Sequence, residues 1–440
     1  MELENLNNNK NEMSKKKDLF FPSGFLWGAA TSAHQVEGNN INDWTEWEQV
    51  NAEKLAKSAG QKWQRWQQEQ FPAMFEAGNY ISGQACDHYR RYGQDFDIAK
   101  SLGHNAHRFS IEWSRIEPEE GQFDEAAIEH YRQVLLALRQ RGLEPFVTLW
   151  HWTNPLWIRD IGGWENKKTI NYFTHYAEKI FNEYRDLVKF WVPLNEPGTQ
   201  VSFGYIFGSQ PPGVKNKLRA NRVLKNLMAA HKKIYSLNRE KKHGFQIGCS
   251  HFMFFNKPYK NLPWNFLVTK IMSYFLDYRF FKVYKNFSDF FGIQYYQPNF
   301  VNLKLGGRIA GLIENKEPYK WVSDLNWEIF PEGIYHVVKK AARYGKPIYI
   351  TENGLADAAD KNRGPFIKEN LKWLHRAINE GVDVKGYFYW SLLDNFEFVD
   401  MRGFWPRFGL VEVDYKTMER KIRPSAYEYA EICKNNTLKL

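Results

Sequence analysis

Two glutamates in this 440-residue sequence stand directly beyond short apolar runs. Glu196 follows the run 190–194 in the segment WVPLNEPG, and Glu352 follows the run 348–351 in YITENG. An ionised carboxylate can attack an electrophilic carbon, and a carboxylic acid that keeps its proton can deliver it to a leaving oxygen. A facing pair with these two roles is what hydrolysis of a glycosidic bond needs. Either glutamate alone is explained as well by a helix N-cap or an ion pair, so only the pair points to this chemistry.

Further polar and aromatic residues stand at the ends of other apolar runs. In chain order they are Gln35, Glu37, Arg108, His151, Trp152, Asn195, Tyr295, Tyr296, Asn353, Trp390, Asp394, Asn395 and Glu397. This set contains no cysteine nucleophile, and no glycine-rich phosphate loop accompanies it. It therefore favours acid–base chemistry over thiol or phosphoryl-transfer chemistry.

The elements that would position these residues recur along the chain. Eight short apolar or β-branched runs cover 25–30, 106–110, 145–149, 190–194, 246–250, 290–295, 348–351 and 384–390, with helical patterns such as 125–141, 169–184 and 332–344 between them. Strands that alternate with helices in this way predict an α/β fold, a single (β/α)8 TIM barrel. Chemistry in such a barrel lies at the C-terminal strand ends, where strands four and seven face each other. The alternative, an open doubly wound sheet, needs a glycine-rich loop after the first strand, and the sequence there is AATSAHQVEG.

The composition is that of a large globular protein. Hydrophobic residues make up 43% and charged residues 25%, which excludes a disordered chain, a collagen and a coiled coil. A mean hydropathy of −0.60 and the lack of a long apolar run argue against an integral membrane protein. The net charge of +10 is scattered along the chain, so we expect no nucleic-acid partner.

The organisation of the chain is predicted to be simple. The first 17 residues are polar and lack a secretory signal's apolar segment, so we expect a disordered tail at 1–17 and one catalytic barrel domain at 18–440. The cysteines Cys86, Cys249 and Cys433 follow no disulfide or zinc spacing, so the expected location is the cytoplasm. The aromatic, lysine-containing segment 258–287 is expected to be a barrel helix that packs inward, with a membrane-surface helix as the alternative.

The order of several segments resembles the glycoside hydrolase family 1 β-glycosidases, from about residue 21 to the C-terminus. These segments are FPSGFLWGAATSAHQVEG, SGQACDHYRRY, HRFSIEWSRI, TLWHWTNPLW, WVPLNEPG, WEIFPEG, YITENG and YWSLLDNFE. The resemblance implies a TIM barrel, a retaining mechanism and no cofactor or metal. It also implies small-molecule β-glycosides or short oligosaccharides as substrates. From the hydropathy we expect no membrane partner. Oligomeric state is not predicted.

The resemblance also implies roles for individual residues. Glu352 corresponds to the nucleophile and Glu196 to the acid/base. The other matches are Gln35, His151, Asn195, Trp390 and Glu397 in the sugar-binding −1 subsite, Arg108 and Tyr296 beside the nucleophile, and Trp327 on the aglycone side. Arg108 near Glu352 would lower the pKa of that carboxyl group. Arg108, His151, Tyr296 and Trp390 each also have an ordinary structural explanation, as an ion-pair partner or a packed core residue.

Two positions and one loop depart from the family pattern. Gln294 stands where the family has Asn, and Phe398 stands where a Trp follows the sugar-binding glutamate; the loop 399–407 is also longer. Phe398 has no N–H to donate to the sugar, so we expect glucosides, galactosides and fucosides to be separated less sharply. The alternative is that Trp405 in the longer loop supplies the missing donor.

Other functions share part of this pattern. A 6-phospho-β-glycosidase is one alternative, although the carboxylate of Glu397 would repel a phosphate. A transglycosylase would use the same residues. A non-catalytic carbohydrate-binding relative would ordinarily have lost one of the two glutamates, and both are present.

Overall fold

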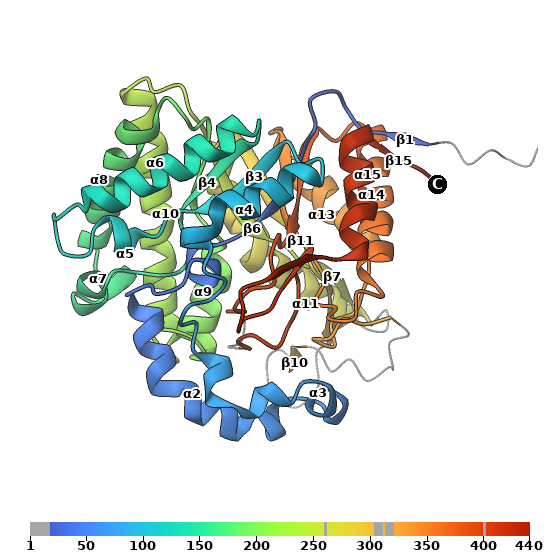
Figure 1. Ribbon diagram of the computed structural model, residues 1–440, viewed down its shortest axis with the longest axis horizontal. Coiled ribbons are helices and arrows are strands. Elements are labelled where there is room, and N and C mark those ends of the chain that lie inside the picture. The colour runs from blue at the N-terminus through green and yellow to red at the C-terminus, as the bar shows by residue number, and fades with distance from the viewer. Residues whose placement is uncertain (1–17, 259–261, 303–310, 313–320, 399–401) are drawn as a thin grey trace, which may run out of the picture.

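The computed structural model describes residues 18–258, 262–302, 311–312, 321–398 and 402–440 (Figure 1). Eight parallel strands close into a barrel in chain order: β2 (Leu26–Ala30), β3 (Ala106–Ser110), β4 (Glu144–Trp150), β5 (Phe190–Leu194), β6 (Gln246–Phe252), β8 (Phe290–Gln294), β11 (Ile348–Asn353) and β12 (Val384–Trp390). The last strand pairs with the first, with Gly386 opposite Leu26. This closure confirms the predicted TIM barrel, and each strand bound lies within two residues of the predicted one.

Helices follow the strands and surround the barrel (Figure 1). The main ones are α4 (His88–Ser101), α6 (Glu125–Gln140), α8 (Lys168–Tyr184), α10 (Lys217–Glu240), α11 (Pro263–Ser273), α12 (Arg279–Tyr284), α13 (Glu332–Ala342), α14 (Arg363–Asn379) and α15 (Pro424–Asn435). An inserted pair, α2 (Asp43–Lys62) and α3 (Arg65–Gln70), lies between β2 and α4. In α6, the side chain of Asp124 caps the first turn, and the buried residues recur every three or four positions, as for an amphipathic helix.

Shorter elements complete the connections. The helical ones are α1 (Ala33–Val36), η1 (Pro72–Phe75), η2 (Ala77–Tyr80), α5 (Trp113–Ile116), α7 (Leu156–Asp160), η3 (Gly163–Glu165), α9 (Pro197–Val201), η4 (Ser202–Phe207) and η5 (Tyr274–Tyr278). The strands are β1 (Leu19–Phe20), β7 (Phe255–Pro258), β9 (Pro298–Asn302), β10 (Gly311–Leu312), β13 (Val411–Val413), β14 (Arg420–Ile422) and β15 (Thr437–Leu438). The predicted tail 1–17 lies outside the described residues, and one catalytic domain at 18–440 stays a prediction.

Aromatic rings fill the interior of the barrel. The ring of Phe146 lies 5.0 to 5.2 Å from the rings of Phe190, Phe290, Tyr349 and Phe388, centroid to centroid. These side chains come from different strands and form an apolar layer of the kind that fills TIM barrels. Aromatic residues make up 17% of the sequence, and several of them thus serve the core.

The segment 258–287 follows the prediction only in part. The helix α12 buries Phe280, Phe281 and Tyr284 against the barrel, as expected. The preceding helix α11 buries only Asn265 and Thr269, so the expected inward packing is wrong for most of its length. Residues 259–261 lie outside the described residues. Within the described ranges, every helix is too short or too polar to cross a membrane.

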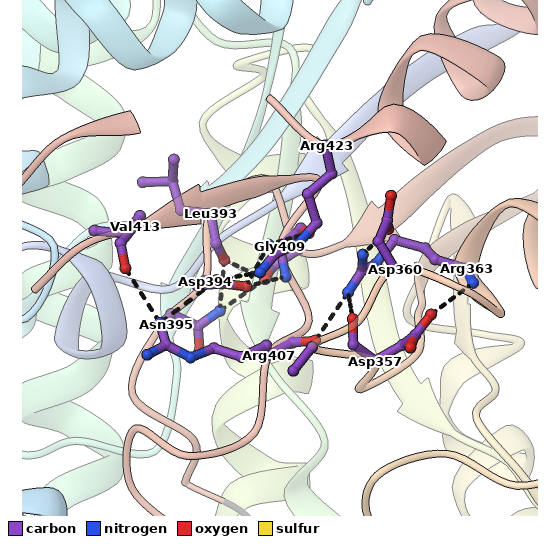
Figure 2. A network of polar contacts seen from close by, with 12 residues as sticks. Asp357, Asp360, Arg363, Leu393, Asp394, Asn395, Arg407, Gly409, Val413 and Arg423 are labelled. Atoms are coloured by element: carbon purple, nitrogen blue, oxygen red, sulfur yellow. Dashed lines mark hydrogen bonds and ion pairs between the residues drawn. The ribbon is translucent and has the colours of Figure 1, made fainter. Parts of the chain in front are cut away.

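Buried ion pairs hold together the segments that follow β11 and β12 (Figure 2). Arg423 donates through Nη1 and Nη2 to the two carboxylate oxygens of Asp394, both at 2.9 Å. Arg363 pairs with Asp360 and donates to the backbone oxygen of Arg407 at 3.0 Å. Because Asp394 is three residues before Glu397, these contacts position the predicted sugar-binding segment.

Candidate active site

The two predicted catalytic glutamates lie at one end of the barrel. Glu196 follows β5 and Glu352 lies in β11; their exposed fractions are 6% and 4%. Both line one cavity of about 740 Å³. The same cavity is lined by Gln35, His151, Asn195, Tyr296, Trp327, Trp390, Glu397 and Phe398. The structure thus brings together residues that the sequence places on six strands or the segments after them, with Trp327 from a loop.

The carboxylate of Glu352 is held at both oxygens. Arg108, at the end of β3, donates from Nη1 to Oε1, and the hydroxyl of Tyr296 donates to Oε2 at 2.7 Å. Arg108 itself is fully buried. A charge-assisted pair and a second donor fix the orientation of this carboxylate in the cavity wall.

The backbone at Glu196 is strained. Its φ and ψ are 40° and 56°, in the left-handed region, and its N–H donates to the backbone oxygen of Ser250 at 2.9 Å. A non-glycine residue in a sparsely populated backbone region costs on the order of 1–3 kcal/mol and is often found where a side chain must be aimed at a site. The strand therefore turns sharply into α9 at this residue.

The environments of the two carboxyl groups separate their pKa values. Burial raises the pKa of Glu352, while the charge of Arg108 and the hydrogen bond from Tyr296 oppose that rise. The pKa of Glu196 lies well above its ordinary value, first because of burial and then because of the negative charge on Glu352. The predicted effect of Arg108 is present, because its charge lowers the pKa of Glu352, but burial has the larger and opposite effect. Glu196 is the group that holds a proton more firmly.

A hydrogen-bond network fixes the amide of Asn195. Its Oδ1 accepts from Arg108 Nη2 at 2.7 Å and from Gln294 Nε2 at 2.9 Å. Its Nδ2 lies 3.0 Å from His151 Nε2, and two donors to Oδ1 make Nδ2 the donor to that nitrogen. Burial and the charge of Arg108 lower the pKa of His151 well below its ordinary value, so the ring is neutral. The second hydrogen on Nδ2 of Asn195 is left for a ligand.

Gln294 therefore reaches the site despite its departure from the family pattern. The longer side chain donates to Asn195, while its Oε1 is buried without a hydrogen-bond partner among the described residues. The added methylene keeps the amide within range of its neighbour.

Gln35 joins the end of β2 to the segment after β12. Its Oε1 accepts from Ser32 Oγ at 2.6 Å, and its Nε2 donates to Asn395 Oδ1 at 2.9 Å and to the backbone oxygen of Phe396 at 2.6 Å. Glu397, one residue further on, is buried and lines the cavity. Gln35 thus orients the neighbouring acidic residue as well as lining the cavity itself.

The aromatic residues of the site differ in how they are held. Trp390 is buried, with its ring 6.1 Å from that of His151, whereas Trp327 is half-buried near Tyr296. Phe398 is only 1% exposed, and its ring lies 4.2 Å from that of Trp44. Phe398 is therefore firmly packed, and it also lines the cavity.

Trp405 does not take the place of the missing tryptophan. Its ring packs against Phe71 and Trp63 at 5.0 and 5.6 Å, and it is absent from the described lining of the cavity. Its Nε1 is buried without a partner in the described part of the chain. The alternative in which Trp405 replaces the donor is not supported by this geometry.

Comparisons with known proteins identify the family of the chain. The model of glycosyl hydrolase family 1 matches residues 17–281 and 271–438. The chain belongs to glycosyl hydrolase family 1. It is 33% identical to β-glucosidase A of Thermotoga maritima, over 95% of this chain and 98% of that protein. It is 29% identical to a β-galactosidase of Pyrococcus woesei, over 94% and 97%. The solved β-glycosidase of Pyrococcus horikoshii superposes with a TM-score of 0.84 at 35% identity, covering 96% and 97%.

Membership in glycosyl hydrolase family 1 confirms the predicted family and makes the chain a glycoside-hydrolysing enzyme.

Some strand-end residues serve the fold instead of lining the cavity. Glu37 pairs with Arg115 at 2.9 Å, and Asn353 donates to the backbone oxygen of Tyr295 at 2.5 Å. Among the described residues, no group of three His, Cys, Asp or Glu side chains is arranged to hold a metal ion.

The sequence analysis also missed a charged residue that lines the cavity of this family 1 site. Arg402 is buried and lines the cavity, with its guanidinium 4.9 Å from the ring of Trp63 and 5.2 Å from that of Trp327. It lies in the loop 399–407, of which 399–401 are outside the described residues. Because Trp63 and Trp327 are distant from Arg402 in the sequence, no local pattern indicates that Arg402 belongs to the site.

Proposed function

We propose that the chain is a retaining β-glycosidase that hydrolyses terminal non-reducing β-D-glucosides, with Glu352 as nucleophile and Glu196 as acid/base. The observation that carries this proposal is the contrast between two buried carboxyl groups in one cavity. Only Glu352 is bonded at one oxygen by an arginine and at the other by a tyrosine. A pair whose surroundings separate the two pKa values is what an acid and a nucleophile require.

The first step forms a bond from Glu352 to the anomeric carbon while the bond from that carbon to the aglycone oxygen breaks. Glu196 gives its proton to the departing oxygen. Asn195 can donate its remaining amide hydrogen to the sugar 2-hydroxyl, a contact that strengthens as positive charge develops on the ring.

The second step removes the sugar from the enzyme. Esterified Glu352 carries no negative charge, so one cause of the raised pKa of Glu196 disappears. Glu196 then takes a proton from water, the water oxygen attacks the anomeric carbon, and Glu352 leaves as a carboxylate. Two displacements return the β configuration.

The remaining site residues are proposed to bind the sugar. Gln35, His151 and Glu397 supply polar contacts, Trp390 supplies a flat apolar face, and Trp327 lies on the aglycone side. Because Phe398 has no N–H donor, Glu397 alone would read the outer hydroxyls O4 and O6. We therefore propose that β-galactosides and β-fucosides are also substrates, with kcat/KM within about one to two decades of that for β-glucoside, since one neutral hydrogen bond is worth about 0.5–1.5 kcal/mol. The β-galactosidase relative is consistent with this range.

The cytoplasm is our proposed location. Cys86, Cys249 and Cys433 are free thiols in the structure, and all three are buried. This is the usage expected in a reducing compartment.

The proposal is tested by Glu352→Gln and Glu352→Gly, measured with 4-nitrophenyl β-glucoside. Turnover should fall by about 10³-fold or more, and azide should restore Glu352→Gly and give the α-glycosyl azide. The exposed Glu412, in β13, provides the control Glu412→Gln, which should keep full activity. NMR of the first-formed anomer should show the β product from the wild type. An α product, or a Glu352→Gly variant with nearly normal activity, would overturn the mechanism.

A 6-phosphoglycoside substrate is a second candidate, which the buried Arg402 in the cavity wall favours. The carboxylate of Glu397 in the same wall opposes it. A panel of nitrophenyl glycosides with and without a 6-phosphate separates the two, and product analysis at high sugar concentration measures transglycosylation.

A further inference from the structure

The cavity extends well beyond the two carboxyl groups. We call its outer part the gallery, defined by the lining residues Phe203, Phe207, Leu224, Met272, Phe275 and Leu276. They come from η4, from α10, and from α11 and η5. Two segments on either side of β6 in the sequence thus contribute apolar side chains to one cavity.

The gallery begins beside Glu196. The chain runs from this residue directly into α9 and then into η4, and Thr199 and Val201 line the cavity between Glu196 and Phe203. If Glu196 protonates the leaving oxygen, as the proposed function requires, the aglycone lies on its side. The gallery is therefore the space that receives the aglycone.

The walls of the gallery are held in place by buried contacts. In η5, Asp277 is buried and accepts from Lys340 Nζ of α13 at 2.5 Å. In η4, a Cβ at Gly204 would lie 2.6 Å from the backbone oxygen of Pro211, so glycine permits this close approach. Both η4 and η5 are π-helical turns, which are frequent at functional sites.

The chemistry of the walls favours hydrocarbon over sugar. The defining residues carry only aromatic, aliphatic and thioether groups. Beyond the catalytic end, the charged lining residues in the described ranges are the cations Lys217 and Arg279, and Arg279 donates to Asn221 at 3.3 Å. Hydroxyl groups buried against such walls lose hydrogen bonds to water, whereas methylene groups gain from leaving water.

The outer rim of the gallery is apolar and open to solvent. Phe207 and Phe275 are 42% and 55% exposed, although both line the cavity. A flexible chain that leaves the gallery would lie across these rings and cover them. A short aglycone would end before it reached them.

We propose that the gallery binds the hydrocarbon chain of amphiphilic β-glycosides, with alkyl-type aglycones as the preferred class over a second sugar. The assignment to the aglycone rests on the proposed function. Alkyl 1-thio-β-glucosides test the binding separately, because the dissociation constant can be measured whether or not the enzyme hydrolyses the compound.

The dissociation constants of ethyl to octyl 1-thio-β-glucosides should be measured by calorimetry on the full chain, below the concentration at which each compound forms micelles. Each added methylene should tighten binding by about 2- to 4-fold until the gallery is filled, roughly 50-fold or more over the series. Cellobiose and cellotriose analogues with a thio linkage should gain less from each added sugar. A flat alkyl series, or a steeper rise with added sugars, would overturn the proposal.

Two phenylalanines of the segment 263–278 provide a matched pair of variants. Phe275→Ser should reduce the gain from ethyl to octyl thioglucoside by about 5-fold or more, because roughly two methylenes lose their contact. Phe266 is also exposed, at 46%, but does not line the cavity, so Phe266→Ser should keep the full gain. Equal effects of both variants would mean that the chain binds to the surface, which contradicts the gallery. Phe207→Ser tests the opposite wall with the same expected loss.

Hydrolysis of 4-nitrophenyl β-glucoside is measured on the same samples. If this substrate is hydrolysed and the thioglucoside series is flat, the gallery assignment is wrong and the proposed function stands. If the series is steep and no glucoside is hydrolysed, the proposed function fails while the gallery still binds hydrocarbon.

Discussion

Replacing Arg108 by methionine should impair the site because it removes the cation that stabilises the carboxylate of Glu352. Arg108 donates to Glu352, to Asn195 Oδ1 at 2.7 Å and to Ser250 Oγ at 3.3 Å. Methionine keeps an unbranched side chain but removes the charge and every donor. Glu352 would then be a buried carboxylate without its cationic partner.

The expected stability loss is about 3–5 kcal/mol, the usual effect of removing one partner from a buried ion pair. Burial raises the pKa of Glu352 above its value in the unfolded chain. Below that unfolded value the carboxyl group is protonated in both states and does not lower the free energy of unfolding. As the pH rises from there through the folded pKa, ionising the buried group costs free energy, so the free energy of unfolding falls. Without Arg108 that pKa rises further. The difference in unfolding free energy between wild type and variant should therefore widen as the pH rises.

The kinetic effect follows from the same contact. A hydrogen bond to a charged group is worth about 1.5–3 kcal/mol, so kcat/KM should fall about 10- to 150-fold near the pH optimum. The acid limb of the pH profile, which reports ionisation of Glu352 in our mechanism, should move to higher pH.

The assay is kcat/KM for 4-nitrophenyl β-glucoside across the pH range, with circular dichroism to confirm folding. Arg420→Met is the matched control, since Arg420 forms a fully buried pair with Asp95 away from the cavity. It should destabilise the fold without moving the acid limb. An unmoved acid limb in Arg108→Met, or an equal shift in Arg420→Met, would refute the reasoning.

Three other variants examine the rest of the site. Glu196→Ala should flatten the alkaline limb and slow alkyl glucosides about 10²- to 10⁴-fold, with little effect on activated phenols that need no proton; equal losses would point to another acid. Gln294→Met removes one of the two donors to Asn195 and should lower kcat/KM for β-glucoside by about 2- to 12-fold. The loss should be smaller for the 2-deoxy glycoside, and equal losses for both substrates would show that Gln294 plays no part in recognition of the 2-hydroxyl. Phe398→Trp overfills the contact with Trp44 and should cost about 1–3 kcal/mol of unfolding free energy, while an unchanged glucoside-to-galactoside ratio would show that Phe398 does not set the sugar range.

The sequence alone predicts the fold and most of the residues that line the catalytic part of the cavity. Apolar runs alternating with helical patterns are local signals, and they predicted all eight barrel strands, including the short strand of Ala106–Ser110. Parallel strands in a barrel bring their C-terminal ends to one side. For that reason, the sequence predicts that Glu196 and Glu352 face each other at one end of the barrel.

Only the tertiary structure decided properties that depend on segments distant in the chain. The net rise in the pKa of Glu352 reflects burial by many segments, which outweighs the one arginine that the sequence identified. The stacking of Arg402 on Trp63 and Trp327 joins residues with no common local pattern, and so does the lining of one cavity by both Phe203 and Phe275. Periodicity is set by neighbours along the chain, whereas desolvation and cavity shape are set by whichever segments pack together.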